Sequence, residues 1–123
     1  MSILSAMLGN ASDVDPSEIA EEYAPILAEG ETIEAAFKMV RDTYVFTSKR
    51  LILVDKQGMT GRKVEYRSIP YRAVTQFTVE NAGAFDTDSE VRIWVSGQAE
   101  PIVRELKRGA NVEAIQKALA SIL

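Results

Sequence analysis

The chain has 123 residues, of which 46% are apolar, which suits one globular domain with a proper core and is too apolar for a disordered chain. It contains no cysteine and no histidine. This excludes a disulfide framework, a thiolate metal site and a cysteine nucleophile, and it removes the commonest general base and transition-metal ligand. The composition therefore predicts a protein that is not an enzyme and that needs no cofactor.

The net charge of −4 hides a strong segregation of acidic and basic residues along the chain. Residues 1–40 carry a net charge of −7, residues 41–72 carry +5, residues 73–100 carry −4 and residues 101–123 carry +2. Solvated strand faces of different sign explain this pattern, and so does a basic surface that meets an anion or an acidic neighbour. A sequence pI of about 4.9 disfavours nucleic acid as a partner.

No apolar run approaches the roughly 20 residues that a membrane-spanning helix needs. The first eight residues are apolar, but no basic flank accompanies them, and they do not resemble a secretory signal. These features predict a cytoplasmic protein.

The first 30 residues predict a helical segment. Asp15-Pro16-Ser17-Glu18 is a good helix start, because Asp15 can cap, Pro16 suits the first turn and Glu18 can complete a capping box. Pro25 must kink or split this helix, and Gly30 ends it.

From Ile33 onward the apolar period changes to two, which predicts a series of short strands. The first strand is expected to be half-buried, and the Arg41-Asp42 pair is expected to form the turn after it. Uninterrupted apolarity in Leu51–Val54 indicates a strand that is covered on both faces. The expected strands are 33–40, 44–47, 51–55, 63–69, 74–80, 91–96 and 102–107, followed by a helix that Asn111 caps and that ends at 122.

The segment 45–71 carries a family resemblance. Its pattern F-T-x-K-R-L-I-L-V-D-x-Q-G-x-T-G-x-K-x-E-Y-x-S-I-P-Y resembles the bacterial pleckstrin-homology (PH) family, formerly a domain of unknown function. A second pattern, E-x-A-G-x-F-D-x-D-x-E, matches residues 80–90, although Asn81 departs from the threonine of the family.

The resemblance implies a mainly β fold with helices, the PH-like barrel. Seven antiparallel strands would form two near-orthogonal sheets capped by the C-terminal helix, with residues 1–30 as an N-terminal helical extension of a PH-like domain at 31–123. The resemblance also implies self-association into closed rings, with no assigned biological role.

Two motifs resemble known binding sites. The Gly58–Gly61 loop has the wrong spacing for a phosphate-binding P-loop, and it joins strands where a KH domain joins helices, so its glycines are expected to serve a hairpin turn. Asp86, Asp88 and Glu90 alternate like the start of a calcium loop. Val91 stands where that loop needs glycine, so a turn is expected and no metal is predicted.

The candidate ligand-binding residues are basic ones on the predicted hairpin, namely Lys56, Arg62, Lys63 and Arg67. Eukaryotic PH domains that bind phosphoinositides use a basic loop between the first two strands. The equivalent Val40–Thr43 segment is short and carries an acid, so that motif does not carry over. Trp94 is expected to be a second-layer core residue, or an interface residue if it is exposed.

These features predict a non-enzymatic PH-like binding or assembly module that forms a cyclic homo-oligomer. Two alternatives stay open. The first is a peripheral anion or acidic-lipid surface binder acting through the basic hairpin, with weak membrane contact at most. The second is a carboxylate-based enzyme. The identity of any further protein partner is not indicated by the sequence.

Overall fold

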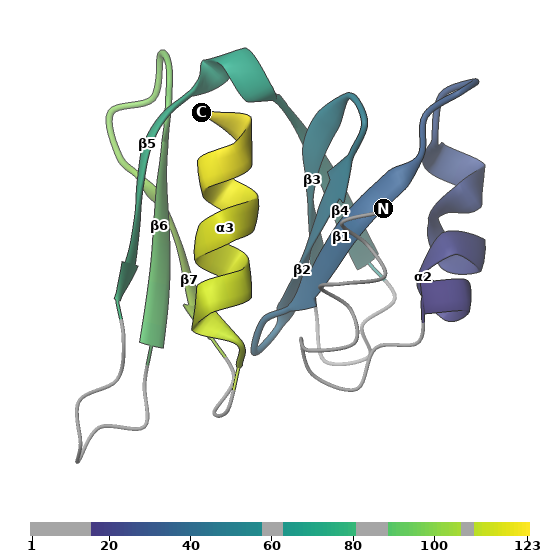
Figure 1. Ribbon diagram of the computed structural model, residues 1–123, viewed down its shortest axis with the longest axis horizontal. Coiled ribbons are helices and arrows are strands. Elements are labelled where there is room, and N and C mark those ends of the chain that lie inside the picture. The colour runs from purple at the N-terminus through teal and green to yellow at the C-terminus, as the bar shows by residue number, and fades with distance from the viewer. Residues whose placement is uncertain (1–15, 58–62, 81–88, 107–109) are drawn as a thin grey trace.

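The computed structural model describes residues 16–57, 63–80, 89–106 and 110–123 (Figure 1). Within them lie two α-helices, two short 3₁₀ helices and seven strands. Their bounds are α2 Pro16–Tyr23, η1 Ala24–Ile26, β1 Ile33–Lys38, β2 Asp42–Thr47, β3 Arg50–Gln57, β4 Lys63–Pro70, η2 Tyr71–Ala73, β5 Val74–Glu80, β6 Ser89–Val95, β7 Ile102–Leu106 and α3 Val112–Ile122.

The strands form two antiparallel sheets, ordered β1-β2-β3-β4 and β5-β6-β7 (Figure 1). The sheets meet where the end of β1 approaches β7. There Met39 forms an isolated bridge with Leu106, and the Val40 amide donates to the Glu105 carbonyl at 3.2 Å. The predicted fold, seven antiparallel strands in two sheets with a C-terminal helix, is confirmed.

Helix α3 lies between the two sheets and completes the inner core (Figure 1). It begins at the predicted cap, where the Asn111 Oδ1 accepts a hydrogen bond from the Ala114 amide at 3.0 Å. Ile115 and Leu119 are 1% and 0% exposed, packed in one cluster with residues from both sheets. The apolar stripe predicted from the sequence is therefore the surface that holds the two sheets together.

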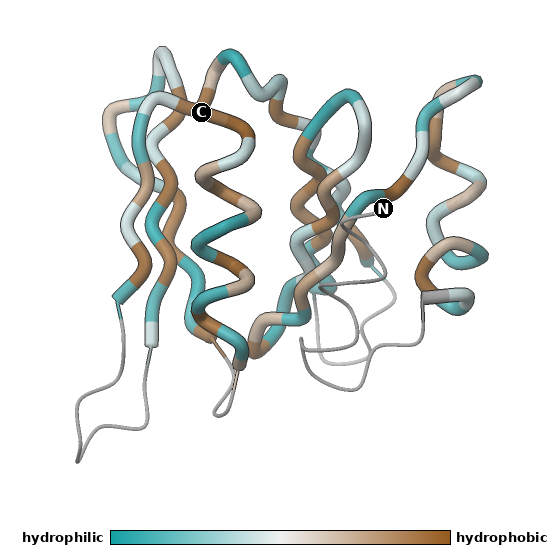
Figure 2. Tube along the Cα trace, in the orientation of Figure 1, coloured by the Kyte–Doolittle hydropathy of each residue, from teal (hydrophilic) through white to brown (hydrophobic). Residues whose placement is uncertain are grey.

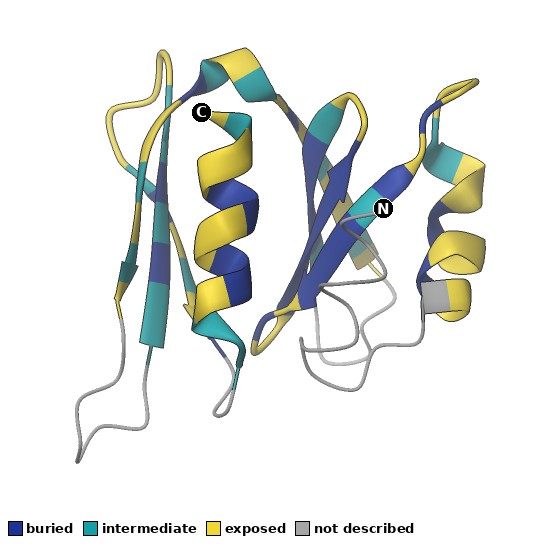
Figure 3. Ribbon diagram, viewed as in Figure 1, coloured by how far each residue is buried: buried dark blue, intermediate teal, exposed yellow. Residues whose placement is uncertain are grey.

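A second core lies on the opposite face of the β1–β4 sheet, under α2 (Figures 2 and 3). Ile19 and Tyr23 of α2 pack there in one cluster with apolar residues of the sheet. The sheet residues are Ile33, Ala36, Val45, Ile52 and Val54. This confirms that Leu51–Val54 is covered on both faces. It also corrects the prediction of a half-buried first strand, because α2 covers the face that was expected to meet solvent.

Every strand begins and ends within two residues of its predicted bounds, and two of the differences from the predictions have a physical explanation. Helix α2 ends at Tyr23 and continues as a 3₁₀ turn that contains Pro25, because a proline in a helix interior removes a hydrogen bond and clashes with the preceding turn. Asp42 was predicted to be a turn residue, but it begins β2, and only 8% of it is exposed.

Leu119→Ala should destabilise the whole domain by about 3 kcal/mol, because it removes a fully buried side chain between the two sheets. A two-state thermal or denaturant melt measures the loss. Gln116→Ala, on the exposed side of α3, is the matched control and should change stability little. Equal melts for Leu119→Ala and the wild type would contradict the observed packing.

Candidate functional site

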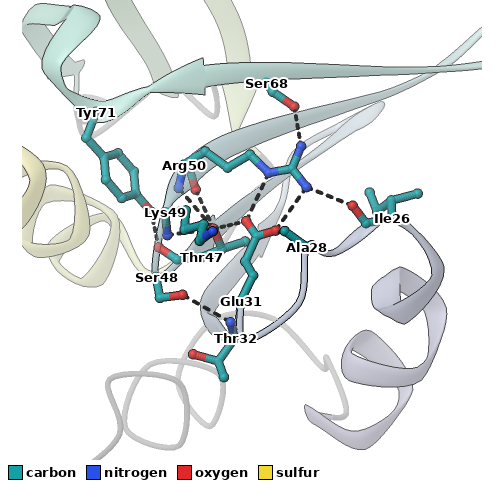
Figure 4. Close-up of polar contacts among 10 residues, drawn as sticks. All are labelled: Ile26, Ala28, Glu31, Thr32, Thr47, Ser48, Lys49, Arg50, Ser68 and Tyr71. Carbon is teal, nitrogen blue, oxygen red and sulfur yellow. Dashed lines mark hydrogen bonds and ion pairs between the residues drawn. The ribbon is translucent and has the colours of Figure 1, made fainter.

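The first polar cluster is a buried carboxylate at the start of β1, which we call the Glu31 clasp (Figure 4). The Glu31 side chain is 0% exposed and faces Arg50, with Nε to Oε2 at 2.9 Å and Nη2 to Oε1 at 3.0 Å. The Thr47 hydroxyl donates to Oε2 at 2.5 Å, and the Ala28 amide donates to Oε1 at 2.8 Å. Both carboxylate oxygens are thus satisfied from within the chain.

The guanidinium of Arg50 connects three parts of the fold (Figure 4). Besides Glu31, its Nη2 donates to the Ile26 carbonyl at 2.8 Å, just after α2, and its Nη1 donates to the Ser68 Oγ of β4 at 2.6 Å. Because η1, the segment just before β1, and strands β3 and β4 all meet at this one side chain, the clasp fixes the N-terminal helix on the outer face of the sheet.

The environment of Glu31 favours its ionised form. The hydrogen bond from Arg50 is the largest cause, and hydrogen bonds from Thr47 and Ala28 add to it, while burial opposes them. Together they lower the pKa of Glu31 from about 4.5 to about 2. The clasp is consequently an ion pair at every physiological pH, which suits a structural contact and not a proton-transferring one.

A second polar cluster lies where the sheets meet. Asp42 of β2 forms an ion pair with Arg104 of β7, and Asp42 stands opposite Asp55 of β3 in the strand register. Burial, and then the hydrogen bond with Asp55, raise the pKa of Asp42, while the charge of Arg104 lowers it. Burial likewise raises the pKa of the Tyr44 hydroxyl.

The predicted basic residues do not gather on one face. Lys56 stands opposite Val64, whereas Lys63 stands opposite Gln57 and Arg67 opposite Leu53. Directly opposed residues of an antiparallel pair share a face, and neighbours along a strand alternate. Lys56 therefore projects on the α2 side of the sheet and Lys63 and Arg67 on the other, and Arg62 lies outside the described residues.

The acidic segment is described only in part, because Asp86 and Asp88 lie outside the described residues. Glu90 is on β6, where it forms an ion pair with Arg92, and Arg92 also approaches Glu80 at 3.5 Å. These contacts give Glu90 a role within the sheet. Trp94 is half-buried on β6, so it is neither a fully buried core residue nor a fully exposed interface residue.

An apolar groove of about 280 Å³ lies between β5 and α3, lined by Val79, Val112, Glu113, Gln116 and Lys117. The described residues contain no group of three or more acidic residues placed to hold a metal ion. Nor is any helix among them long and apolar enough to cross a membrane.

The sequence interpretation missed Glu31, Arg50, Asp42 and Arg104. A signal for the clasp did exist, since Glu31 and Arg50 flank strongly apolar strands on which an unpaired charge would be costly. The sequence does not indicate which acid pairs with which base, because the paired residues are 19 and 62 positions apart.

Comparison with known proteins assigns this architecture to a class. The profile of the bacterial PH domain family matches residues 2–123. A solved pleckstrin homology domain from Shewanella amazonensis SB2B is 57% identical, with a TM-score of 0.78 over 88% of this chain and 97% of that one. A DUF1696 family protein with a pleckstrin-homology domain from Shewanella loihica PV-4 is 51% identical, with a TM-score of 0.78 over 92% and 97%.

The uncharacterized protein YjqA of Bacillus subtilis (strain 168) is 53% identical over 123 residues, which are 99% of this chain and 98% of that protein. The two sheets, the C-terminal helix and these matches define a PH domain of the bacterial type. The chain belongs to the bacterial PH domain family.

Glu31→Gln should destabilise the fold by about 3 kcal/mol near neutral pH, because it leaves the guanidinium of Arg50 without its anion. Since the pKa of Glu31 is lower in the folded than in the unfolded chain, its stabilisation is complete above about pH 4.5 and is lost as the pH falls toward about 2. Unfolding free energies measured from pH 7 to pH 2 should therefore fall less steeply for Glu31→Gln than for the wild type.

The matched control is Glu29→Gln, at an exposed acid two residues away, which should leave the stability at neutral pH nearly unchanged. Parallel pH curves for Glu31→Gln and the wild type would contradict the role assigned to the clasp.

Proposed function

We propose that the protein is a non-enzymatic assembly module whose copies associate head to tail into a cyclic homo-oligomer. The observation that carries this proposal is a pair of unlike, exposed sheet edges on one small domain. Strand β4 ends the four-stranded sheet and β5 ends the three-stranded sheet.

Among the described residues, neither β4 nor β5 has a strand partner on its outer side. Such edges present unpaired backbone amides and carbonyls, which a neighbouring chain can cover. Because the two edges differ, a contact between β4 of one copy and β5 of the next is heterologous, and it closes into a ring when the rotation allows.

The charges of the two regions are complementary. The segment 41–72, which includes β4, carries a net charge of +5, and the segment 73–100, which includes β5, carries −4. On the edges themselves, β4 contributes exposed Lys63 and half-buried Arg67, and β5 ends at exposed Glu80. Such complementarity sets register and encounter rate, while apolar contacts supply most of the affinity.

The internal pairing of the buried acids supports a role in binding over one in catalysis. A general base needs a free lone pair directed at a cavity that can hold substrate. The carboxylate of Glu31 is occupied by Arg50 and Thr47, and Asp42 is paired with Arg104. The 280 Å³ groove beside α3 is lined by one acid, Glu113.

Light scattering at micromolar concentration and moderate salt tests the assembly. The wild-type mass should be a small multiple of 13.6 kDa. Lys63→Glu, alone or with Arg62→Glu, should weaken association about tenfold, equivalent to about 1.4 kcal/mol, by reversing the charge at the β4 edge. Lys56→Glu makes the same charge reversal on the α2 side of the sheet, away from the β4 edge, and is the control that should leave association unchanged. A monomeric wild type would refute the proposal.

Vesicle flotation separates this proposal from a lipid-binding role. Because Lys56 projects from the face opposite to Lys63 and Arg67, these residues cannot all approach one membrane surface. Binding to anionic vesicles should be weak and should disappear when salt is raised, since screened surface charges supply it. Salt-resistant binding that is specific for a phosphoinositide would instead establish the lipid-binding alternative.

A further inference from the structure

Three acids form a row across neighbouring strands of the first sheet. In the strand register Asp42 of β2 stands opposite Asp55 of β3, and Asp55 stands opposite Glu65 of β4. Opposed residues share a face, so the three carboxylates point to the same side of the sheet. Strand alternation places Asp42 on the side of Tyr44 and Phe46, which belong to the inner core.

The opposite sheet supplies one cation to this row. Arg104 lies on the same face of β7 as Ile102 and Leu106, which face the inner core. Its Nε pairs with the Asp42 Oδ2. The Asp42 side chain is 8% exposed, and Asp55 is half-buried. Two carboxylates thus lie side by side next to one guanidinium, which leaves the carboxylate pair with one negative charge more than that guanidinium neutralises.

A proton removes this imbalance. Two carboxyl groups that share one proton carry a single negative charge, which matches the single positive charge of a guanidinium, and like charges in close contact resist joint ionisation. The raised pKa of Asp42, caused first by burial and then by its hydrogen bond with Asp55, agrees with this.

We propose that Asp42 and Asp55 bind one solvent-derived proton between them in the folded protein, and that this proton strengthens the junction between the two sheets. The proton forms an O–H···O hydrogen bond from β2 to β3 beside Arg104. With the carboxyl pair neutralised to a single charge, the ion pair to β7 is no longer opposed by a second neighbouring anion.

The site lies beside the contact that closes the barrel. Val40, two residues before Asp42, donates to the Glu105 carbonyl at 3.2 Å, next to Arg104 on β7. An opening of about 140 Å³ at this corner is lined in part by Asp42 and Arg104, which gives water, and so protons, access to Asp42.

Other charged and titratable groups face or adjoin the pair from each neighbouring element. They are Tyr44 on β2, Arg41 before it, Lys63, Glu65 and Arg67 on β4, and Arg104 and Glu105 on β7. Gln57 adds a neutral donor, with its Nε2 3.4 Å from the Asp55 Oδ2.

The sign of the effect follows from the direction of the shift. Because the pKa of Asp42 is higher in the folded than in the unfolded chain, the folded chain binds the proton more tightly. The stabilisation that the bound proton gives to the folded chain is therefore complete below pH 3.8, the ordinary pKa of aspartate. It is lost as the pH rises through the pKa that Asp42 has in the folded chain. Glu31 acts in the opposite direction, losing its contribution below about pH 4.5.

Carboxyl-carbon NMR titration of the full chain tests the shared proton. In the wild type Asp42 should titrate above its ordinary value. Asp55→Asn removes the neighbouring charge with little change of shape and should move the titration of Asp42 downward. Glu65→Gln removes the next charge in the same row, one strand further away, and should move it less. A wild-type Asp42 that titrates at or below its ordinary value refutes the proposal, as does an equal shift in the two variants.

Hydrogen exchange of the Val40 amide tests the effect on the junction. After correction for intrinsic exchange rates, protection in the wild type should increase several-fold as the pH falls from 7 toward the ordinary aspartate value of 3.8, and in Asp55→Asn it should increase less. A pH-independent protection factor in the wild type would show that the proton does not act on the sheet junction. This measurement needs no variant, so it decides the matter even if Asp55→Asn fails to fold.

Discussion

The four-stranded sheet is buried on both faces over most of β1, β2 and β3, and this constraint governs most of the molecule. Its inner face packs against the second sheet and α3, and its outer face packs against α2 (Figure 3). A strand that is covered on both sides has no solvent face for its polar side chains, and this accounts for the uninterrupted run Leu51–Val54 in β3 and for the aromatic and aliphatic centre of β2, Tyr44–Phe46. Every charge in these strands then needs a specific partner, because an unpaired buried charge is strongly destabilising.

The Glu31 clasp and the Asp42–Arg104 pair meet this need in different ways. The clasp places one anion against one cation, with further donors around the carboxylate, and it is balanced. At the sheet junction Arg104 forms an ion pair with Asp42, and a second carboxyl group, that of Asp55, lies beside this pair. The hydrogen bond from Arg50 is the main reason why the pKa of Glu31 is lowered, whereas burial first and the neighbouring Asp55 second raise the pKa of Asp42.

The sequence predicted the strands better than it predicted the charged contacts. Strand β5 and the capped helix α3 were predicted almost to the residue, because alternation and capping are local signals. The buried outer face of β1 was not predicted, since the helix that covers it lies elsewhere in the chain. The faces on which Lys56 and Lys63 lie depend on the register of the β3–β4 hairpin, which is fixed by the length of its turn. Asp42 was assigned to a turn because nothing in the neighbouring sequence indicates its distant partner, Arg104.

The composition of the outer core has a consequence for the order in which the chain folds. All its members lie between Ile19 and Val64, and the strands they join are sequence neighbours. The inner core, in contrast, needs α3, and the junction at Met39 and Leu106 must wait for the last fifth of the chain. Contacts of low sequence separation form soonest. During synthesis from the N-terminus, we expect the helix-covered sheet to assemble first, as a half-finished barrel whose open side stays exposed until the C-terminal helix emerges.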